Sequence, residues 1–139
     1  AAQRGAEAGA AAIGGAAPAT LGITVLTSMD GGTLGEIGVA RPMEEQVVAL
    51  AGLAKQAGIS GVVASPQEAA VLREVLGPEA FVVTPGVRPA GAERGDQSRV
   101  ATPAEAFANG ASHIVVGRPI TQADDPLAAF EAIAGELRS

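Results

Sequence analysis

Cysteine, tryptophan and tyrosine are absent from this sequence of 139 residues, and histidine and lysine each occur once. Without cysteine, neither a disulfide nor a thiolate metal site can form. One histidine cannot build a metal site from several histidines, and it argues against a Ser-His-Asp triad. We therefore expect a protein that uses no metal.

The sequence also lacks a basic run and a long apolar stretch. Its formal net charge is −6, which argues against a surface that binds nucleic acid. No apolar stretch approaches the roughly 18 residues that a membrane-spanning helix needs, and no signal peptide is recognisable. We expect a soluble, cytoplasmic protein. The chain does not begin with Met, and its first residues resemble the interior of a longer sequence.

Small and aliphatic residues dominate what is present. Apolar residues make up 47% of the chain, but phenylalanine, with three copies, is the sole aromatic type. Alanine, valine, leucine and isoleucine must therefore fill the core. Most of the 19 glycines and 9 prolines fall where turns or helix ends are expected, which favours a folded chain over a disordered one. The length predicts one domain.

Short apolar runs recur along the chain. Four of them predict strands, at residues 21–27, 59–64, 81–84 and 113–116. The first run does not alternate between apolar and polar residues, which predicts burial on both faces, as in a parallel sheet.

Helix signals follow each predicted strand. Pro42 suits the first position of one helix, and Ser65–Glu68 and Thr102–Glu105 have the capping-box pattern that starts two more. Asp125 and Pro126 start the last. Apolar residues recur at helical spacing in the first and last of these helices, at Met43, Val47, Leu50, Ala51 and Ala54, and at Leu127, Phe130, Ile133 and Leu137. The Ala-rich residues 1–16 predict an outer helix without a chemical role.

Four strand–helix units in succession predict a parallel sheet with right-handed crossovers. A closed (β/α)₈ barrel has eight units and typically about 250 residues, so this chain cannot close one alone. Four units leave exposed edge strands. The alternatives are a flavodoxin-like open sheet, a half-barrel that pairs with another, or a piece of a longer chain.

A phosphate-binding corner is predicted between residues 81 and 118. Gly86 with Arg88, and Gly117 with Arg118, follow the last two strands, at the end where parallel α/β folds bind ligands. Arginine forks contact phosphate oxygens, and glycine lets backbone amides approach. The Gly-rich loop 89–98 reads as a closing lid. The alternative is that the arginines form surface ion pairs, with Glu93 or Asp124 as partners.

Other candidates for chemistry are weaker. Neither a Walker motif nor a dinucleotide-binding glycine pattern is present, which argues against ATP and NAD. Lys55, near the end of a predicted helix, is interpreted as a solvated partner of the helix dipole. His113 comes at the start of its strand, the wrong end for catalysis, and is expected to be structural.

Four ordered segments resemble a known family. They are ITVLTSMD (23–30), GVVASPQEA (61–69), VTPGVRPAGAERGDQSRVATPAEA (83–106) and VVGRPIT (115–121). From about residue 21 to the C-terminus the chain resembles bacterial orotidine 5′-phosphate decarboxylases. The resemblance implies a (β/α)₈ TIM barrel of which this chain supplies strands five to eight. It also implies the conversion of orotidine 5′-phosphate to UMP and CO2 in pyrimidine biosynthesis, without cofactor or metal.

The resemblance also assigns substrate contacts to positions of this chain. These positions end or follow predicted strands, and they are Thr27, Ser28, Arg88, Gln97, Gly117 and Arg118. By resemblance, Thr27 contacts the nucleotide and Ser28 lies beside the pyrimidine. Arg88 is the arginine of the loop after strand seven, Gln97 grips the phosphate from the lid, and the last two hold the phosphate at strand eight.

The chemical half of the family's site is missing from this sequence. The family's lysine and aspartates form the motif Asp-x-Lys-x-x-Asp, which does not occur here, and Lys55 cannot replace it. We therefore assign no catalytic residue to this chain. Residues 1–20 are interpreted as an outer helix and linker, and residues 21–139 as the C-terminal half of a barrel.

Two hypotheses follow. In the first, the chain is the C-terminal half of a decarboxylase, active with an N-terminal half that is missing or supplied as a separate chain, and the assembly is a homodimer. In the second, it is a non-catalytic half-barrel that binds a nucleotide monophosphate or inorganic phosphate, with dimerisation through its open edges.

Overall fold

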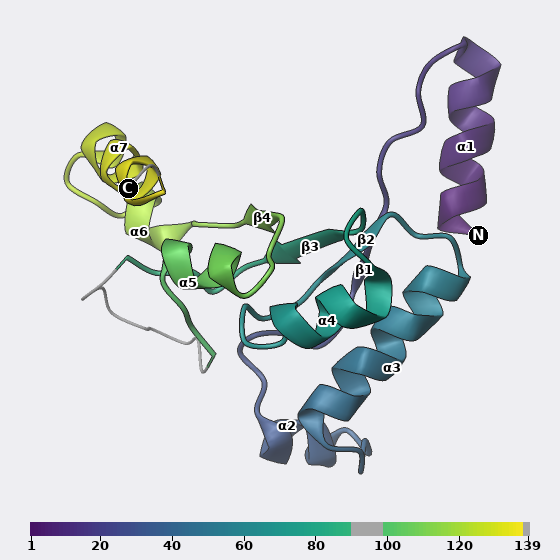
Figure 1. Cartoon of the computed structure of the whole chain (residues 1–139), viewed down its shortest axis with the longest axis horizontal. Coiled ribbons are helices and arrows are strands. Elements are labelled where there is room, and N and C mark those ends of the chain that lie inside the picture. The colour runs from purple at the N-terminus through teal and green to yellow at the C-terminus, as the bar shows by residue number, and fades with distance from the viewer. Residues whose placement is uncertain (90–98, 138–139) are drawn as a thin grey trace.

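The computed structural model describes residues 1–89 and 99–137, and its centre is one parallel sheet (Figure 1). The strand order is β1-β2-β3-β4, so each strand lies beside the next one along the chain. The bounds are β1 (Leu21–Ile23), β2 (Gly61–Val63), β3 (Phe81–Thr84) and β4 (His113–Ile114). All three pairings are parallel, as the succession of strand–helix units predicted.

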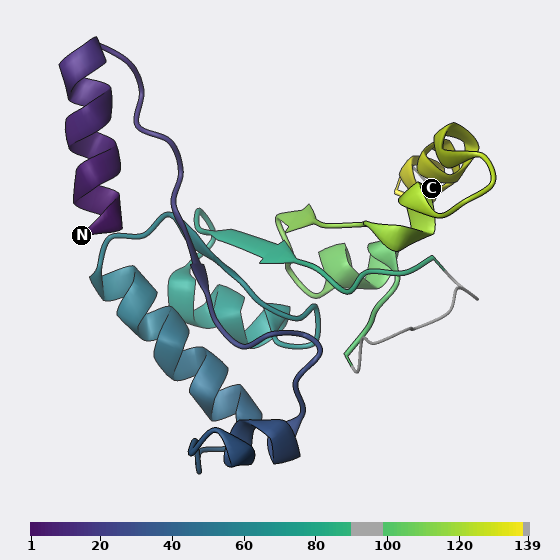
Figure 2. The same ribbon diagram turned by 180° about the vertical axis from the view of Figure 1, so that it is seen from behind.

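Seven helices in the described residues connect and flank the strands. They are α1 (Ala2–Ile13), α2 (Gly31–Glu36), α3 (Met43–Gln56), α4 (Ala69–Leu76), α5 (Pro103–Ala108), α6 (Arg118–Thr121) and α7 (Pro126–Glu136). Helices α3, α4 and α5 contact β2, β3 and β4 respectively, while α1 stands away from the sheet in both views (Figures 1 and 2). Within the described residues, no helix is both long enough and apolar enough to cross a membrane.

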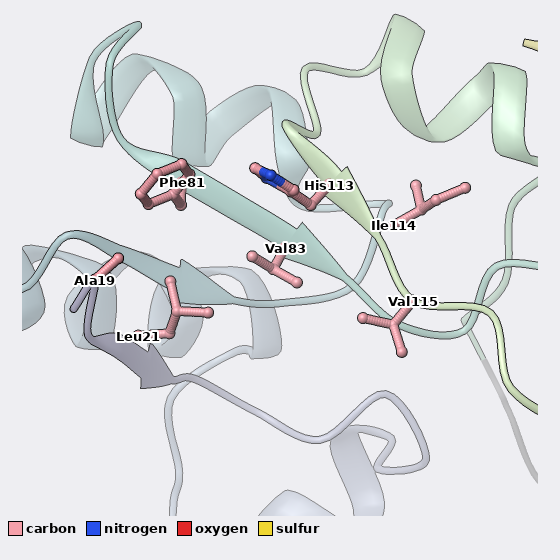
Figure 3. Close-up of a pocket in the computed structure, with 7 residues that line it drawn as sticks. All are labelled: Ala19, Leu21, Phe81, Val83, His113, Ile114 and Val115. Carbon is pink, nitrogen blue, oxygen red and sulfur yellow. The ribbon is translucent and has the colours of Figure 1, made fainter.

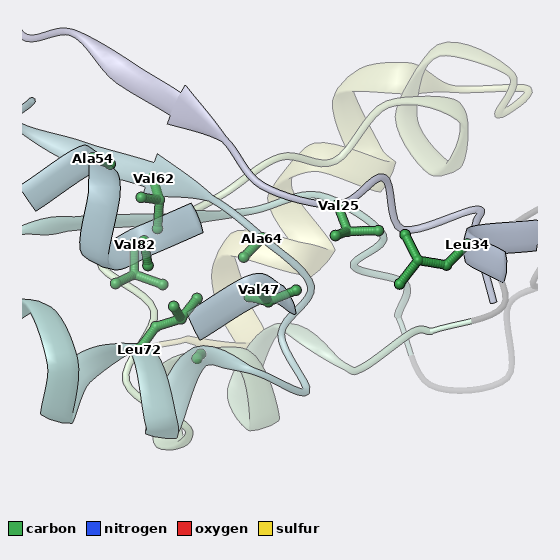
Figure 4. Close-up of a cluster of buried hydrophobic side chains, with 10 residues drawn as sticks. Val25, Leu34, Val47, Ala54, Val62, Ala64, Leu72 and Val82 are labelled. Carbon is green, nitrogen blue, oxygen red and sulfur yellow. The ribbon is translucent and has the colours of Figure 1, made fainter. Parts of the chain in front are cut away.

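The core lies between the sheet and the helices α3 and α4. Val62 and Val82 project from β2 and β3 onto Val47 of α3 and Leu72 of α4, and all four are fully buried (Figure 4). Burial of each such side chain stabilises the fold by about 1.5–3 kcal/mol. The helical stripe predicted for α3 is confirmed, because its members are buried in this cluster or packed against it.

The strands are mostly shorter than the apolar runs that predicted them. Residues 81–84 form β3 as expected, but β1 ends at Ile23 instead of residue 27. The Thr24 amide still donates to the Val63 carbonyl at 3.1 Å, and then a turn closed by the Met29 amide on the Leu26 carbonyl carries the chain away from the sheet. Beyond the strand, Val25 is buried in the core, whereas Leu26 is exposed.

One face of the sheet is open, which corrects the prediction that the first strand is buried on both faces. Leu21 and Ile23 of β1 are exposed. With Phe81, Val83 and their neighbours, Leu21 lines a hollow of about 400 Å³ (Figure 3). In a closed barrel the inward side chains of all strands fill the interior. Four strands cannot close, so this surface has no covering layer within the described residues.

Helix starts agree with the sequence at some positions. Thr102 and Glu105 form the capping box that opens α5, and Asp125 caps α7. Pro42 is the residue before α3, not its first helical residue. The capping box predicted at Ser65 does not open a helix: the Glu68 carboxylate bonds back to Ser65, but the Ser65 hydroxyl accepts the Gln67 amide at 3.2 Å, and α4 begins at Ala69 without a side-chain cap.

The predicted apolar stripe of α7 is largely uncovered. Ile133 is buried, but Leu127, Phe130 and Leu137 are exposed. The helix therefore presents an apolar surface away from the sheet core.

The lone lysine and histidine both make structural contacts, although Lys55 bonds to α4 and not only to solvent as predicted. The ammonium of Lys55, in the last turn of α3, donates to the Val75 carbonyl at 2.7 Å. His113 begins β4, and its ring packs edge-to-face on Phe81 with centroids 5.3 Å apart.

Candidate functional site

The carboxyl ends of the four parallel strands meet at one edge of the sheet, which we call the carboxyl edge. Four connections leave from it: residues 24–30 after β1, 64–68 after β2, 85–102 after β3 and 115–117 after β4. In parallel α/β folds this edge is where ligands bind. The site residues expected from the sequence fall on these connections, except Arg118, which begins α6 directly after the last one, and Gln97, which lies outside the described residues.

The connection after β1 carries Thr27 and Ser28 in the turn that begins at Leu26. Thr27 is buried and Ser28 is exposed. Both line a hollow of about 170 Å³, whose opposite side is formed by the ends of β2 and β3, including Ala64 and Pro85. The structure thus brings the two predicted nucleotide contacts to one recess on the carboxyl edge.

Asp30 follows this turn and serves the fold. It caps α2: its carboxylate accepts hydrogen bonds from the Thr33 amide at 2.8 Å and from the Thr33 hydroxyl at 2.9 Å. These bonds hold the pKa of Asp30 below its ordinary value because they favour the ionised form.

Arg88 follows β3 and is buried, with 8% of its surface exposed. Its amide donates to the Ala101 carbonyl at 2.9 Å, and its guanidinium donates to the Val87 carbonyl at 2.9 Å. Val87 also forms a parallel bridge with Ala101. The two ends of the connection after β3 are therefore held side by side. Glu93, a possible ion-pair partner, lies outside the described residues.

Gly117 and Arg118 follow β4. Gly117 is the residue before α6, and its carbonyl accepts the amides of Ile120 and Thr121. Both Gly117 and Arg118 are exposed. The β3–β4 pairing puts this connection next to the one that carries Arg88, so the structure places the two predicted arginines on adjacent connections.

A buried ion pair that lies on the same edge was not predicted from the sequence. Glu68, after β2, pairs with Arg99, at the end of the connection after β3. The Arg99 guanidinium also donates to the Leu26 carbonyl at 3.0 Å. Both residues are more than nine-tenths buried. The pattern Ser65–Glu68 suggested a capping box; the Glu68 carboxylate does bond to Ser65, and it also pairs with Arg99, which the pattern did not indicate.

Burial and charge act in opposite directions on Glu68. Burial raises the pKa of its carboxyl, because the ionised form loses hydration, and the positive charge of Arg99 lowers it. Hydrogen bonds from the backbone and the hydroxyl of Ser65 also lower the pKa, but Arg99 supplies the largest of the opposing effects.

The fold and the site together define a class of protein. Four successive β/α units, one open sheet face and connections gathered at the carboxyl edge are the features of half of a (β/α)₈ barrel. The chain belongs to the orotidine 5′-phosphate decarboxylase / HUMPS family, whose sequence model matches residues 1–133. The match includes residues 1–20, which precede the first motif of the resemblance.

Individual relatives agree with this assignment. The chain is 57% identical over 129 residues to the orotidine 5′-phosphate decarboxylase of Moorella thermoacetica, covering 92% of this chain and 51% of the relative. It is 57% identical over 133 residues to that of Halorhodospira halophila, covering 94% of this chain and 56% of the relative. The chain therefore spans about half the length of the curated relatives it matches.

Solved structures give the same result. The crystal structure of orotidine 5′-phosphate decarboxylase from Lactobacillus acidophilus superposes with a TM-score of 0.80 at 44% identity, covering 99% of this chain and 57% of that one. An uncharacterized conserved protein from Geobacillus kaustophilus superposes with a TM-score of 0.69 at 35% identity, covering 88% of this chain and 50% of that one. The resemblance and the half-barrel fold expected from the sequence are confirmed.

Proposed function

We propose that this chain is the C-terminal, substrate-binding half of an orotidine 5′-phosphate decarboxylase. The completed barrel would convert orotidine 5′-phosphate to UMP and CO2 in pyrimidine biosynthesis, in the cytoplasm and as a homodimer. One observation carries the proposal: relatives with this name share 57% identity over 92–94% of the chain. The division into residues 1–20 and 21–139 is part of the same proposal.

The carboxyl edge supplies the proposed contacts. Thr27 and Ser28 line the recess that would take the nucleoside. Arg88, Arg118 and the Gly117 amide would hold the phosphate, because charge-assisted hydrogen bonds from guanidinium groups suit phosphate oxygens. Gln97 would contribute its amide. Binding energy gained at a remote phosphate can lower the barrier at the reacting carbon.

The proton donor must come from elsewhere. The sequence has no Asp-x-Lys-x-x-Asp motif. Its single lysine lies in the last turn of α3, which leads into the amino end of β2, so Lys55 lies at the edge opposite the predicted contacts. We therefore propose that an N-terminal half-barrel, in the same or a separate polypeptide, covers the open sheet face and brings the lysine and aspartates.

The test uses a completed barrel, which we define as this chain produced together with the part of the M. thermoacetica relative that it does not cover. Decarboxylation is followed by the absorbance change on conversion of orotidine 5′-phosphate to UMP. We expect turnover by the completed barrel and none by either half alone. A completed barrel that is folded and inactive would refute the proposal.

The open edges favour a second candidate, a non-catalytic homodimer. β1 and β4 are the two edges of the sheet, and two copies would provide eight strands. Sedimentation and calorimetric titration of the chain alone with UMP and with inorganic phosphate test it. A dimer that binds either ligand supports this candidate, whereas a monomer that binds neither contradicts it.

A further inference from the structure

Arg99 joins three of the four connections at the carboxyl edge. It lies on the connection after β3, its Nη1 pairs with Glu68 Oε1 after β2, and its Nη2 donates to the Leu26 carbonyl after β1 at 3.0 Å. Nothing in the alternation or spacing of the sequence relates these positions. One guanidinium thus fixes the separation of three loops that carry, or directly flank, the proposed substrate contacts.

The hydrogen bond from Arg99 to the Leu26 carbonyl links Arg99 to the turn that carries two of the proposed substrate contacts. It also accepts the Met29 amide at 3.0 Å, which closes the turn that carries Thr27 and Ser28. Arg99 therefore orients the peptide plane between Leu26 and Thr27. Two residues further on, Ala101 accepts the Arg88 amide at 2.9 Å. The short stretch 99–101 thereby connects the Thr27 turn with the backbone of Arg88.

The buried Arg99–Glu68 ion pair is not expected to contribute much to the stability of the fold. Removing two charges from water costs several kcal/mol per ion, and apolar replacements of buried pairs are often neutral or stabilising. Within the described residues, Glu68 Oε2 and Arg99 Nε are buried without a hydrogen-bond partner, so the compensation is incomplete. A pair of this kind is better explained by the geometry that it imposes.

We infer that Arg99 and Glu68 form a positioning pair for the substrate. They fix the distance between the turn that carries Thr27 and the connection that carries Arg88, so that the nucleoside and the phosphate of one substrate can be bound at the same time. The inference rests on the proposed function. Neither side chain is assigned a contact with substrate. Their loss would loosen the spacing between the two groups of contacts, and a misplacement of about 1 Å can reduce rates on the order of 100-fold.

Arg73 provides a matched control at the opposite edge. Its guanidinium also gathers backbone carbonyls from several connections, donating to Gly110 O at 2.7 Å, Ala80 O at 2.8 Å and Gly77 O at 3.0 Å. These carbonyls precede β3 and β4, at the amino ends of the strands. Arg73 is therefore a structural arginine of similar connectivity without a link to the proposed site.

The experiment compares Arg99→Ala, Arg99→Lys, Glu68→Gln and Arg73→Ala in the completed barrel. For Arg99→Ala we expect the Kd for UMP and the KM for orotidine 5′-phosphate to rise about 10- to 100-fold, with a smaller change in kcat. Glu68→Gln keeps an acceptor for Arg99, so this variant should retain most of the parent's affinity for UMP. The lysine of Arg99→Lys lacks the two guanidinium nitrogens that contact Glu68 and the Leu26 carbonyl at once. Its affinity for UMP should therefore be nearly as low as that of Arg99→Ala.

Arg73→Ala should lower the urea midpoint and leave the UMP affinity of the folded protein unchanged. If Arg99→Ala behaves in the same way, the inference is wrong. The Met29 amide gives a readout without nucleotide: its hydrogen exchange should accelerate in Arg99→Ala but not in Arg73→Ala, and equal rates in Arg99→Ala and the parent would overturn the positioning role. A parent barrel that does not bind UMP refutes the proposed function instead, and the exchange rates still decide whether Arg99 holds the turn.

Discussion

Among individual residues, Arg99 and Glu68 form a buried ion pair at the carboxyl edge. Thr27 and Arg88 could be selected from the sequence because each follows a strand-like run within a recognisable motif. The ion pair could not, because its members are 31 positions apart and their contact depends on how two connections fold over the edge. The local pattern at Ser65–Glu68 indicated Ser65, which is one partner of the glutamate, but not Arg99.

The stability of the Arg99→Ala variant should depend on pH. In the parent, burial raises the pKa of Glu68 and Arg99 opposes that effect. Without Arg99 the pKa of Glu68 rises further. The folded state then binds a proton more tightly than the unfolded chain, so stability falls as pH rises above the ordinary value of 4.5.

Urea unfolding checks this expectation. The midpoint difference between the parent and Arg99→Ala should be small near about pH 4 and larger near about pH 7, where an ionised Glu68 would be buried alone. A double variant, Glu68→Gln with Arg99→Ala, should lose this pH dependence. A difference of the same size at both pH values would contradict the account.

Arg118 should contribute to phosphate binding. Replacement by alanine in the completed barrel removes a cation from the connection after β4, and we expect the Kd for UMP to rise about tenfold or more, since charge-assisted hydrogen bonds are the stronger ones. Arg4→Ala, on the exposed face of α1, serves as the control for lost positive charge. Calorimetric titration gives both values, and equal affinities would return Arg118 to an ordinary surface residue.

At the level of secondary-structure elements, the sheet depends on a glycine in one of its two central strands. Gly61 begins β2 and pairs with Phe81 of β3. A Cβ atom at Gly61 would overlap the carbonyl oxygen and Cβ of Phe81. Backbone groups cannot move aside as a flexible side chain can, so β2 and β3 would have to separate.

Gly61→Ala should therefore lower the free energy of unfolding by about 3 kcal/mol, at the upper end of overpacking costs. Gly52 is the matched control. It lies inside α3, with nothing within 4 Å of a Cβ built there, so Gly52→Ala should stabilise by about 0.5–1 kcal/mol. Urea unfolding of the completed barrel measures both, and equal effects of the two substitutions would refute this explanation.

The type and order of the elements could be predicted, but several of their ends could not. Capping chemistry placed the starts of α5 and α7 because Thr102 and Asp125 act on neighbouring amides. The end of β1 depended on a turn closed at Met29, and apolar residues continue through it. Local patterns report local interactions, and strand ends are set by the neighbouring strand.

On the scale of the whole molecule, the open sheet face is the feature that the sequence could not show. An apolar run such as residues 21–27 indicates that burial is needed, without indicating what provides it. In this chain Leu21 and Ile23 remain exposed, as do Leu127 and Phe130 of α7. Together with a length of about half the relatives, these exposed surfaces support the proposal that an N-terminal half-barrel covers the open sheet face.

The site assignment is tested most directly by locating UMP on the completed barrel. Amide chemical shifts of this chain, isotopically labelled and titrated with UMP, report each residue separately. The account predicts saturable shifts at the carboxyl edge, including Thr27 and Gly117, and unchanged amides at Gly58 and Gly110 on the opposite edge. Shifts confined to the amino edge, or no shifts from a barrel that is folded, would contradict it.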